Sequence, residues 1–546
     1  MADKGDTRPI LAIYDVSGIQ EYIFSTSRLR ENTGASLIVR HILKEELPEA
    51  IREVGSKLDG DVFTEWESDK PFQMKSNPQA QVEVIYNGGG SAVVAYRKKE
   101  AYDEVNIILA KRLIQISYTL TLATTCLETD FENYSRDRAA LALKLEEVKE
   151  RLPRQRPMGS FPIVEQESLT GWPITQRDIW NQDISTVQAL KRQAAEKSKE
   201  RDFQDVLPSA DVSFAIEMED LRAEKGEDSF VAVVHLDGND MGRILQEKIA
   251  GFEDYQHSVG EMRKLSKAIT DLYRDIFKKL VKEINDQIKD PQTSPYAVKR
   301  IGGKDEYILP IRPLILDGDD ITFICTGRLG IALAAAFLRR LASTSNAGFQ
   351  PSACAGVALV PSHFPFNIAY EMAESCCSNA KARRRKLNDT AGYLDFHIGH
   401  GAHIKDVPDW REEEYGGYRD GYSLLKRPYR IPAQRDEEHQ PSFDRLDSLL
   451  ANPPFGAGIV EGKDEVWPRS RLKALYEAYR TGPEQVAFLL EELASRGHSL
   501  PASIRPAFDE QGETYMYDAL ELMDLYERGL FQGLTEGESA AEGGNQ

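Results

Sequence analysis

The stretch Arg312-Pro-Leu-Ile-Leu-Asp317-Gly318-Asp319-Asp320-Ile-Thr-Phe-Ile-Cys325 contains the strongest fold signal in this chain. Two short runs of β-forming residues flank an Asp-Gly pair, which favours a tight turn between antiparallel strands. The sequence therefore predicts a β-hairpin with carboxylates from Asp317, Asp319 and Asp320 at its tip. Such a tip is explained equally well by a solvated polar turn or by a metal site.

A second acidic cluster follows a continuous apolar run over residues 230–236, which is typical of a strand buried on both faces. The run ends in Asp237-Gly238-Asn239-Asp240-Met241-Gly242. Mg²⁺ prefers hard oxygen ligands, commonly one or two carboxylates with phosphate oxygens and water. Asp237, Asp319 and Asp320 are therefore the candidate metal ligands and catalytic residues.

The order of elements around these clusters predicts an α+β fold. We expect a strand near 229–237, a helix near 259–288, the hairpin at 312–325, a helix at 328–343, a strand at 352–360 and a helix at 365–387. This is βαββαβ with a trailing helix, the order of a ferredoxin-like sheet. Residues 9–127 show the same order more weakly, so two ferredoxin-like domains are predicted.

The hairpin of the first copy turns at Asn87-Gly88-Gly89-Gly90 and carries no carboxylate, so this copy is not expected to hold a metal. The glycines fit a turn that needs positive φ. They fit equally well a surface where the backbone comes close to a phosphate or a base.

These motifs resemble those of the palm-domain large subunit of type III CRISPR complexes, and more distantly those of GGDEF-type nucleotide cyclases. The resemblance rests on residues 237–242, on Asp317-Gly-Asp-Asp320, and on a segment from Ala355 to Ala380-Lys381. At the N-terminus, Asp15 to Phe24 and Gly34 to Val39 look like the opening of the family's first palm.

The resemblance implies a metal-dependent nucleotidyl cyclase or polymerase-type nucleotidyltransferase. It would join nucleoside triphosphates, with ATP favoured, into cyclic or linear oligonucleotide signals in antiviral defence, using Mg²⁺ or Mn²⁺. Lys381 would contact the triphosphate, and Gly238, Gly242 and Gly318 would let the backbone approach the phosphates. Partners from a CRISPR-like defence system would follow, and an oligomer is compatible with the sequence.

Two positions depart from the family pattern. Asp317 stands where the family has the first glycine of Gly-Gly-Asp-Asp, and Asn239 stands where it usually has Asp. We predict that Asp317 serves the turn and points away from the metal, because alternate residues of a strand face opposite sides. The alternative function is therefore a catalytically degenerate nucleotide-binding protein, or a scaffold subunit of a CRISPR-like ribonucleoprotein.

The sequence has no His-Asp dipeptide and no Cys-x-x-Cys pair. We therefore expect a stand-alone or divergent relative that lacks the metal-dependent nuclease domain and the zinc finger. The domains predicted are a palm-like domain without an acidic hairpin (1–127), a helical connecting region (128–226), a second palm (227–430), a helical C-terminal domain (431–532) and a disordered tail (533–546).

The composition bounds the remaining alternatives. The net charge of −20 over 546 residues argues against a general nucleic-acid coat, which needs clustered Lys and Arg. No run approaches 18 apolar residues, so no membrane span is expected. With no apolar signal region and five cysteines without a disulfide pattern, the expected location is the cytoplasm.

Overall fold

The computed structural model describes most of the chain as two compact units. The described residues are 8–67, 70–152, 163–168, 170–201, 203–221, 230–252, 254–288, 307–344, 350–399, 407–415, 421–432, 441–456, 466–498, 500 and 507–527. The first unit comprises Met1–Asp205, Asp240–Asp275 and Leu314–Asp320, and the second Val206–Asn239, Ile276–Pro313 and Ile321–Gln546. The predicted tail at 533–546 lies outside the described residues, and the predicted domain boundaries stay predictions.

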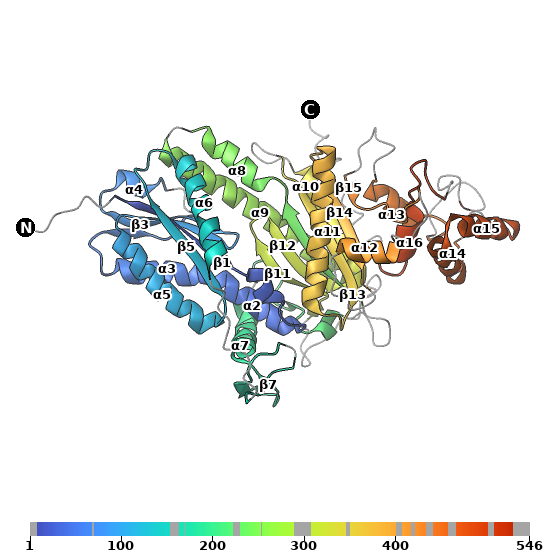
Figure 1. Cartoon of the computed structure of the whole chain (residues 1–546), viewed down its shortest axis with the longest axis horizontal. Helices are drawn as coiled ribbons and strands as arrows, with labels where there is room; N and C mark the ends of the chain where they lie inside the picture. Colours follow the sequence, from blue (N-terminus) through green and yellow to red (C-terminus); the bar gives the residue numbers. More distant parts are fainter. Residues whose placement is uncertain are drawn as a thin grey trace, which may run out of the picture. The chain divides into compact units, whose positions relative to one another are not determined.

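The first unit is built on a five-stranded sheet in the order β2-β3-β4-β1-β5 (Figure 1). Its strands are β1 (Ile10–Ser17), β2 (Asp61–Phe63), β3 (Ala80–Gly88), β4 (Ser91–Tyr96) and β5 (Thr121–Glu128). The strand β1 is antiparallel to both β4 and β5. Its apolar run is buried because β4 and β5 lie on its two edges and helices pack on both faces of the sheet.

Helices cover both faces of this sheet. They are α1 (Ile19–Phe24), α2 (Leu29–His41), a π-helical segment (Ile42–Glu46), α3 (Leu47–Gly55), α4 (Gln73–Ser76), α5 (Lys99–Ser117), α6 (Tyr134–Arg151), α7 (Thr186–Arg201), α8 (Met241–Ala250) and the first part of α9 (Tyr255–Ile288). Tyr14 of β1 has its ring 6.1 Å from that of Tyr102 in α5. Leu11, on the opposite face of β1, belongs to a core cluster with Tyr134 of α6 and Tyr255 of α9.

Residues 29–55 are helical without a break. The helix α2 continues through the π-helical segment into α3, and Pro48 occupies the first turn of α3. Two further short strands, β6 (Gln176–Arg177) and β7 (Asp183–Ile184), form a small hairpin before α7. The region 128–226, which was predicted as largely helical, therefore contains short strands as well.

The second unit is built on a six-stranded mixed sheet in the order β11-β12-β9-β13-β14-β15. Its elements are β8 (Val212–Phe214), a 3₁₀ turn (Met218–Leu221), β9 (Phe230–Gly238), β10 (Tyr307–Leu309), β11 (Ile311–Asp317), β12 (Asp320–Thr326), α10 (Gly327–Ser343), β13 (Ala353–Pro361), α11 (Phe366–Leu387), β14 (Gly392–Ile398), α12 (Val407–Tyr415) and β15 (Tyr429–Ile431). The strand β13 is antiparallel to β9 and parallel to β14. The α+β fold class predicted from the sequence is confirmed.

Glycines allow two helices to pack closely on opposite faces of this second sheet. A Cβ atom at Gly330 of α10 would lie 2.3 Å from the Cβ of Ala232 in β9. A Cβ at Gly356 of β13 would lie 1.9 Å from the backbone oxygen of Ala373 in α11. Figure 1 shows α11 lying across β13 and β14. This close approach fixes the position of α11, which carries Lys381.

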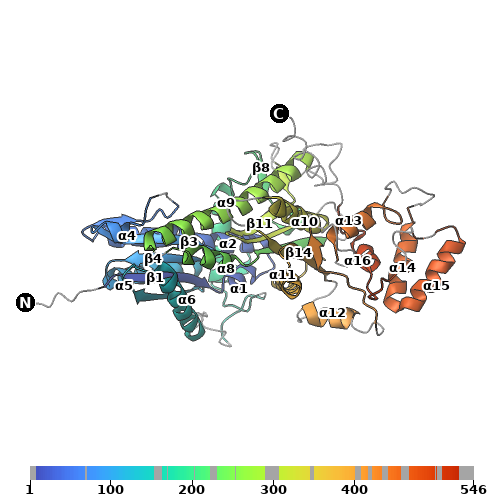
Figure 2. The ribbon, with the colours of Figure 1, turned by 90° about the horizontal axis from the view of Figure 1, so that it is seen from above.

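The C-terminal part of the second unit is helical. It contains α13 (Phe443–Ala451), α14 (Arg469–Thr481), α15 (Pro483–Ser495) and α16 (Tyr515–Leu522). Figure 2 shows α14 and α15 side by side. The helices α14 and α15 are separate because Gly482, with φ of 150°, and Pro483 lie between them. Across the ranges described above, no helix is long and apolar enough to cross a membrane.

Candidate functional site

The acidic hairpin forms as predicted. The strand β11 ends at Asp317, β12 begins at Asp320, and Gly318 turns the chain with φ of 61°. Glycine adopts this left-handed conformation without steric cost, which explains its presence after Asp317. The turn places Asp317, Asp319 and Asp320 on the wall of one pocket.

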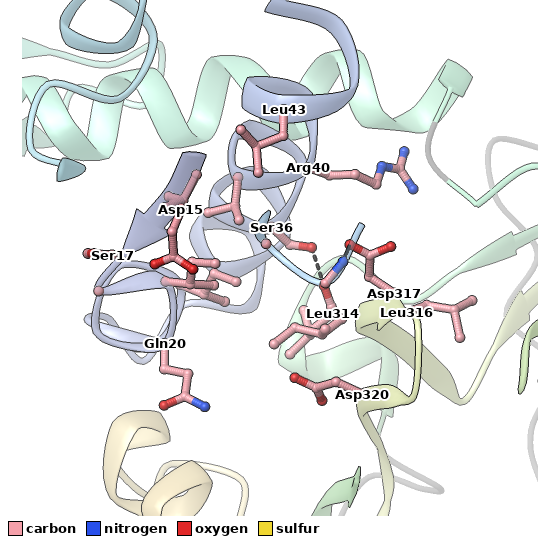
Figure 3. Close-up of a pocket in the computed structure, with 18 of the residues that line it drawn as sticks. Asp15, Ser17, Gln20, Ser36, Arg40, Leu43, Leu314, Leu316, Asp317 and Asp320 are labelled. Atoms are coloured by element: carbon pink, nitrogen blue, oxygen red, sulfur yellow. Dashed lines mark hydrogen bonds between the residues drawn. The ribbon is translucent and has the colours of Figure 1, made fainter. Parts of the chain in front are cut away.

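This hairpin pocket has a volume of about 620 Å³ and lies within the first unit (Figure 3). Its walls come from the β1–α1 turn, α2, the π-helical segment, the Gly89-Gly90 turn and residues 314–320. Four aspartates line it together with three cationic side chains: Asp15, Asp317, Asp319, Asp320, Arg40, Lys44 and Lys149. The pocket therefore offers hard oxygen donors for a cation and positive charges for an anion.

Asp317 is bound by residues of the N-terminal part of the first unit. One carboxylate oxygen lies 2.9 Å from Nζ of Lys44, and the other accepts a hydrogen bond of 2.9 Å from the backbone N–H of Gly89. Both carboxylate oxygens of Asp317 therefore have partners in the protein.

The strand β11 is also fixed to α2 at the base of the pocket. The hydroxyl of Ser36 donates a hydrogen bond to the backbone oxygen of Leu314, drawn as a dashed line in Figure 3. Ser36 is buried, with 7% of its surface exposed. The segment from Gly34 to Val39 therefore supports the acidic hairpin of the first unit, a role that its sequence did not reveal.

Asp15 is a pocket carboxylate that was not predicted as a site residue. Its side chain is 18% exposed and lies 2.9 Å from Nζ of Lys149. Burial raises the pKa of Asp15, although the positive charge of Lys149 works in the opposite direction. The sequence placed Asp15 in a segment that resembles the first palm, and its position at the end of a buried strand was the available signal.

The pocket carboxylates also affect a nearby phenol. Burial raises the pKa of Tyr86, and the negative charges of Asp317 and Asp319 raise it further. Tyr86 therefore stays protonated at neutral pH. The effect shows that the charges of the hairpin tip reach into the surrounding protein, where a bound cation would offset them.

In the second unit, Lys381 is paired with Asp237. The ammonium group of Lys381 forms a salt bridge with the Asp237 carboxylate and donates a hydrogen bond of 3.1 Å to the backbone oxygen of Gly238. The predicted residues Asp237, Gly238 and Lys381 thus lie together at the end of β9. Next to them, burial lowers the pKa of His235 to about 4, so its imidazole is neutral at pH 7.

Asn239 has a structural partner at the start of β13. Its backbone N–H donates to the backbone oxygen of Ser352 at 2.8 Å, and its side-chain nitrogen donates to the hydroxyl of Ser352 at 3.1 Å. Asn239 is only 3% exposed. The amide donates to this hydroxyl, whereas a carboxylate at this position could only accept from it.

The predicted site residues therefore fall into two groups. Asp319 and Asp320 line the hairpin pocket of the first unit, directly after the turn at Gly318, and Asp237 with Lys381 lies in the second unit. Within the described part of the chain, no three His, Cys, Asp or Glu side chains form a cluster that could hold a metal by themselves. A metal shared by Asp237, Asp319 and Asp320 stays a prediction.

Gly242 belongs to the first turn of α8, and a Cβ atom there would meet nothing within 4 Å. Protein packing therefore does not require glycine at this position. The open space leaves room for a phosphate beside the backbone of this turn. The predicted role of Gly242 in phosphate binding stays a prediction.

No family model and no curated protein sequence matches this chain. Solved structures match it in fold at low sequence identity. A chain of the Csm1-Csm4 cassette in complex with cA4 superposes with a TM-score of 0.53 and 13% identity, over 94% of this chain and 69% of that chain. The cassette in complex with cA3 gives 0.53 and 14%, over 97% and 71%.

A third structure, the Csm1-Csm4 cassette in complex with AMPPNP, gives a TM-score of 0.52 and 14% identity, over 94% of this chain and 69% of that chain. Identity this low relates the chains in fold alone. The fold of this protein is therefore similar to that of a chain in the Csm1-Csm4 cassette.

Proposed function

We propose that this protein is a metal-dependent nucleotidyltransferase of the palm type, which binds nucleoside triphosphates and joins them into a cyclic or linear oligonucleotide. In this proposal each βαββαβ sheet is a ferredoxin-like palm. The observation that supports it best is the hairpin pocket, which combines Asp319 and Asp320 with the cations of Arg40, Lys44 and Lys149.

Asp319 and Asp320 would hold Mg²⁺ or Mn²⁺. The donor set fits such a cation, because Mg²⁺ is commonly bound by one or two carboxylates with phosphate oxygens and water. When bound, the metal would supply charge stabilisation at the phosphoryl group. The residues of the chain bind and orient the nucleotide around it.

Cationic side chains supply the complementary binding of the phosphates. Arg40 and Lys149 line the pocket, and Lys44 lies at its wall in contact with Asp317. Lys381 would contact the triphosphate, exchanging its contact with Asp237 for a phosphate oxygen. The turn at Gly318 and the turns at Gly238 and Gly242 would allow the backbone to approach the phosphates.

The adenine nucleotides named with the Csm1-Csm4 structures favour ATP as the substrate. A protein partner equivalent to Csm4, and a place in a CRISPR-like antiviral complex, follow from the same similarity. The partner and the complex are proposals, because the similarity to the Csm1-Csm4 cassette is one of fold.

The second candidate function is a nucleotide-binding or scaffold protein without turnover. Asn239 favours this function, because the chain has a neutral amide near Asp237 where a second carboxylate would help to bind a metal. That amide donates a hydrogen bond to Ser352. The engagement of Asp317 favours it as well, since this carboxylate is bound by the protein.

One experiment separates these functions. The purified chain is incubated with each of the four labelled nucleoside triphosphates and Mn²⁺, and the products are identified by mass spectrometry. A phosphodiester-linked product that disappears in the Asp319→Asn/Asp320→Asn double variant supports the transferase. Metal-dependent binding without product supports the binding protein, and copurifying RNA supports the scaffold.

A further inference from the structure

A second cavity of the first unit has the features of a ligand site. Its volume is about 560 Å³, and it lies behind the β1–α1 turn, with walls from α1, α7 and the residues that precede β5. Hydroxyl groups line much of it: Ser25, Thr26, Thr119, Thr121, Thr170 and Ser185. The half-buried indole of Trp172 forms another part of the wall. The volume is within the range of about 300–1,000 Å³ typical of small-molecule pockets.

Lys191 provides a buried cation in this wall. Its surface is 0% exposed, and its ammonium group donates to the backbone oxygen of Tyr22 and, at 2.7 Å, to the hydroxyl of Ser25. An ammonium has three donor hydrogens, so these two bonds leave one, and the Nζ atom also lies 4.3 Å from the centroid of the Tyr22 ring. No carboxylate in the described ranges forms a salt bridge with Lys191, although the charge of Glu31 acts on it. The cost of burying the ammonium is therefore offset only in part, and a bound anion would offset it further.

Gln188, one turn before Lys191 on α7, contributes a second donor. Its side-chain oxygen accepts hydrogen bonds from the backbone N–H and the hydroxyl of Ser185, at 3.0 and 3.1 Å. Its side-chain nitrogen is buried and has no hydrogen-bond partner, while Gln188 as a whole is 1% exposed. Buried donors are rarely left unsatisfied, so this amide needs an acceptor in the cavity.

The other charged groups around Lys191 are already paired. One carboxylate oxygen of Glu31 of α2 accepts from Arg192 of α7 at 2.8 Å, while its other oxygen is buried without a hydrogen-bond partner. Lys149 of α6 is bound to Asp15. Glu21 of α1 lies on the wall. Burial lowers the pKa of Lys191 to about 7, and the charge of Glu31 opposes this shift. Burial raises the pKa of Tyr22, so its phenol stays neutral.

We propose that this cavity binds a phosphate monoester of nucleotide size, with the phosphate at Lys191 and Gln188 and the planar part of the ligand against Trp172. Hydroxyl groups along the wall suit the polar groups of a sugar. Ser17, Gly18, Glu21 and Lys149 line both this cavity and the hairpin pocket. A ligand here would therefore touch the β1–α1 turn that also forms the hairpin pocket.

Binding of the phosphate favours the charged form of Lys191. An anion beside an ammonium raises the pKa of that ammonium, so binding takes up a proton wherever the free lysine is partly neutral. At pH 7 the free lysine is partly neutral, since its pKa is about 7, so binding of the phosphate dianion should take up a fraction of a proton. The affinity should fall as the pH rises above 7, by up to roughly tenfold per pH unit, and should also fall below about pH 6, where the phosphate monoester binds its own second proton.

Calorimetric titration of the full chain with adenosine 5′-monophosphate tests the proposal. EDTA keeps the hairpin pocket free of metal, and two buffers with different ionisation enthalpies report the proton uptake. We expect saturable binding with proton uptake, weaker binding of inorganic phosphate with the same uptake, and no binding of adenosine. Binding of adenosine as tight as that of the monophosphate, or binding without proton uptake, would overturn the proposal.

Variants assign the binding to this cavity. Lys191→Met and Gln188→Leu should each weaken binding at least tenfold, while Lys197→Met, at an exposed position of the same helix, leaves it unchanged. The Asp319→Asn/Asp320→Asn protein should bind as the unaltered chain does. Unchanged affinity in the folded Lys191→Met protein contradicts the proposal. If that variant does not fold, the proton uptake of the unaltered chain decides.

Discussion

The carboxylate of Asp317 accepts a hydrogen bond of 2.9 Å from the backbone N–H of Gly89, 228 positions earlier in the chain. One hairpin tip thus binds the other: the turn that has three glycines and no carboxylate receives a carboxylate from the acidic turn. Asp317 therefore has a structural role in joining the two turns. A glycine at this position, as in the Gly-Gly-Asp-Asp pattern, has no carboxylate and could not make this contact.

We therefore expect Asp317→Gly to destabilise the protein although it restores the Gly-Gly-Asp-Asp pattern. The variant leaves Lys44 and the N–H of Gly89 without their acceptor, which should lower the free energy of unfolding by about 1 kcal/mol at this partly exposed position. Asp317→Asn should have a smaller effect because its amide oxygen can still accept from Gly89. Urea unfolding measures both, and a double-mutant cycle with Lys44→Met that gives no coupling energy contradicts the pairing.

Asp319 and Asp320 should be required for metal-dependent nucleotide binding. Removing one carboxylate by Asp319→Asn or Asp320→Asn is expected to weaken Mn²⁺-ATP binding by about 1.5–3 kcal/mol, the value of an interaction with a charged group, or roughly 10- to 100-fold. Calorimetry with Mn²⁺-ATP is the measurement, and Asp317→Asn is the neighbouring control. Equal losses in all three variants would indicate a general effect of charge instead of metal ligation.

Lys381, which forms a salt bridge with Asp237, should also bind the phosphates of a nucleotide. Lys381→Met keeps the aliphatic part of the side chain and removes its charge, so the affinity for ATP should fall while that for adenosine does not. Lys386→Met, at an exposed position of the same helix, is the matched control. If both variants bind ATP as tightly as the unaltered chain, the role of Lys381 is structural. It then only stabilises the end of β9 through its contacts with Asp237 and Gly238.

Two glycines should respond to alanine in opposite ways. A Cβ at Gly356 would lie 1.9 Å from the backbone oxygen of Ala373 and 2.3 Å from the backbone nitrogen of Cys377. Gly356→Ala must displace α11, and we expect a loss of about 3 kcal/mol or more in the free energy of unfolding.

Gly242→Ala adds its methyl group in open space, so stability should change by less than about 0.5 kcal/mol. Its nucleotide affinity should fall, because the methyl group would stand where we propose that the phosphate approaches the backbone. Thermal unfolding and calorimetry on the same samples separate the two effects. Gly242→Ala with unchanged nucleotide affinity would remove this turn from the proposed site.

Lys191 should make the stability depend on pH in the alkaline range. Its pKa is about 7 in the folded protein and near 10.5 when unfolded, so the unfolded chain binds more protons between these values. The free energy of unfolding contributed by this group therefore rises as the pH increases from 7 to 10.5. Below pH 7 the buried charge destabilises the fold fully.

Urea unfolding at pH 6, 7, 8 and 9 tests this dependence. The stability of the unaltered chain should rise relative to that of Lys191→Met as the pH increases, because the variant has no buried ammonium to deprotonate. Lys197→Met should parallel the unaltered chain, since its side chain is exposed. A constant difference between the unaltered chain and Lys191→Met would show that Lys191 does not titrate in this range.

The sequence by itself determined the local elements that build the site. The apolar run at 230–236 predicted β9, and the Asp317-Gly318 pair between two β-forming runs predicted the hairpin, because turn chemistry and burial patterns act over a few residues. The same reasoning identified Asp319 and Asp320 as neighbours at a hairpin tip.

Only the tertiary structure decided which side chains meet. The partners of Asp317 are Lys44 and Gly89, and Asn239 binds Ser352, more than 100 positions away in sequence. Lys191 looks like any surface lysine in a charged helix, yet α7 packs against α2 so closely that its ammonium is buried. Sequence periodicity predicts whether a residue is buried. The tertiary fold decides which groups form hydrogen bonds or ion pairs with a buried polar side chain, because those groups come from distant parts of the sequence.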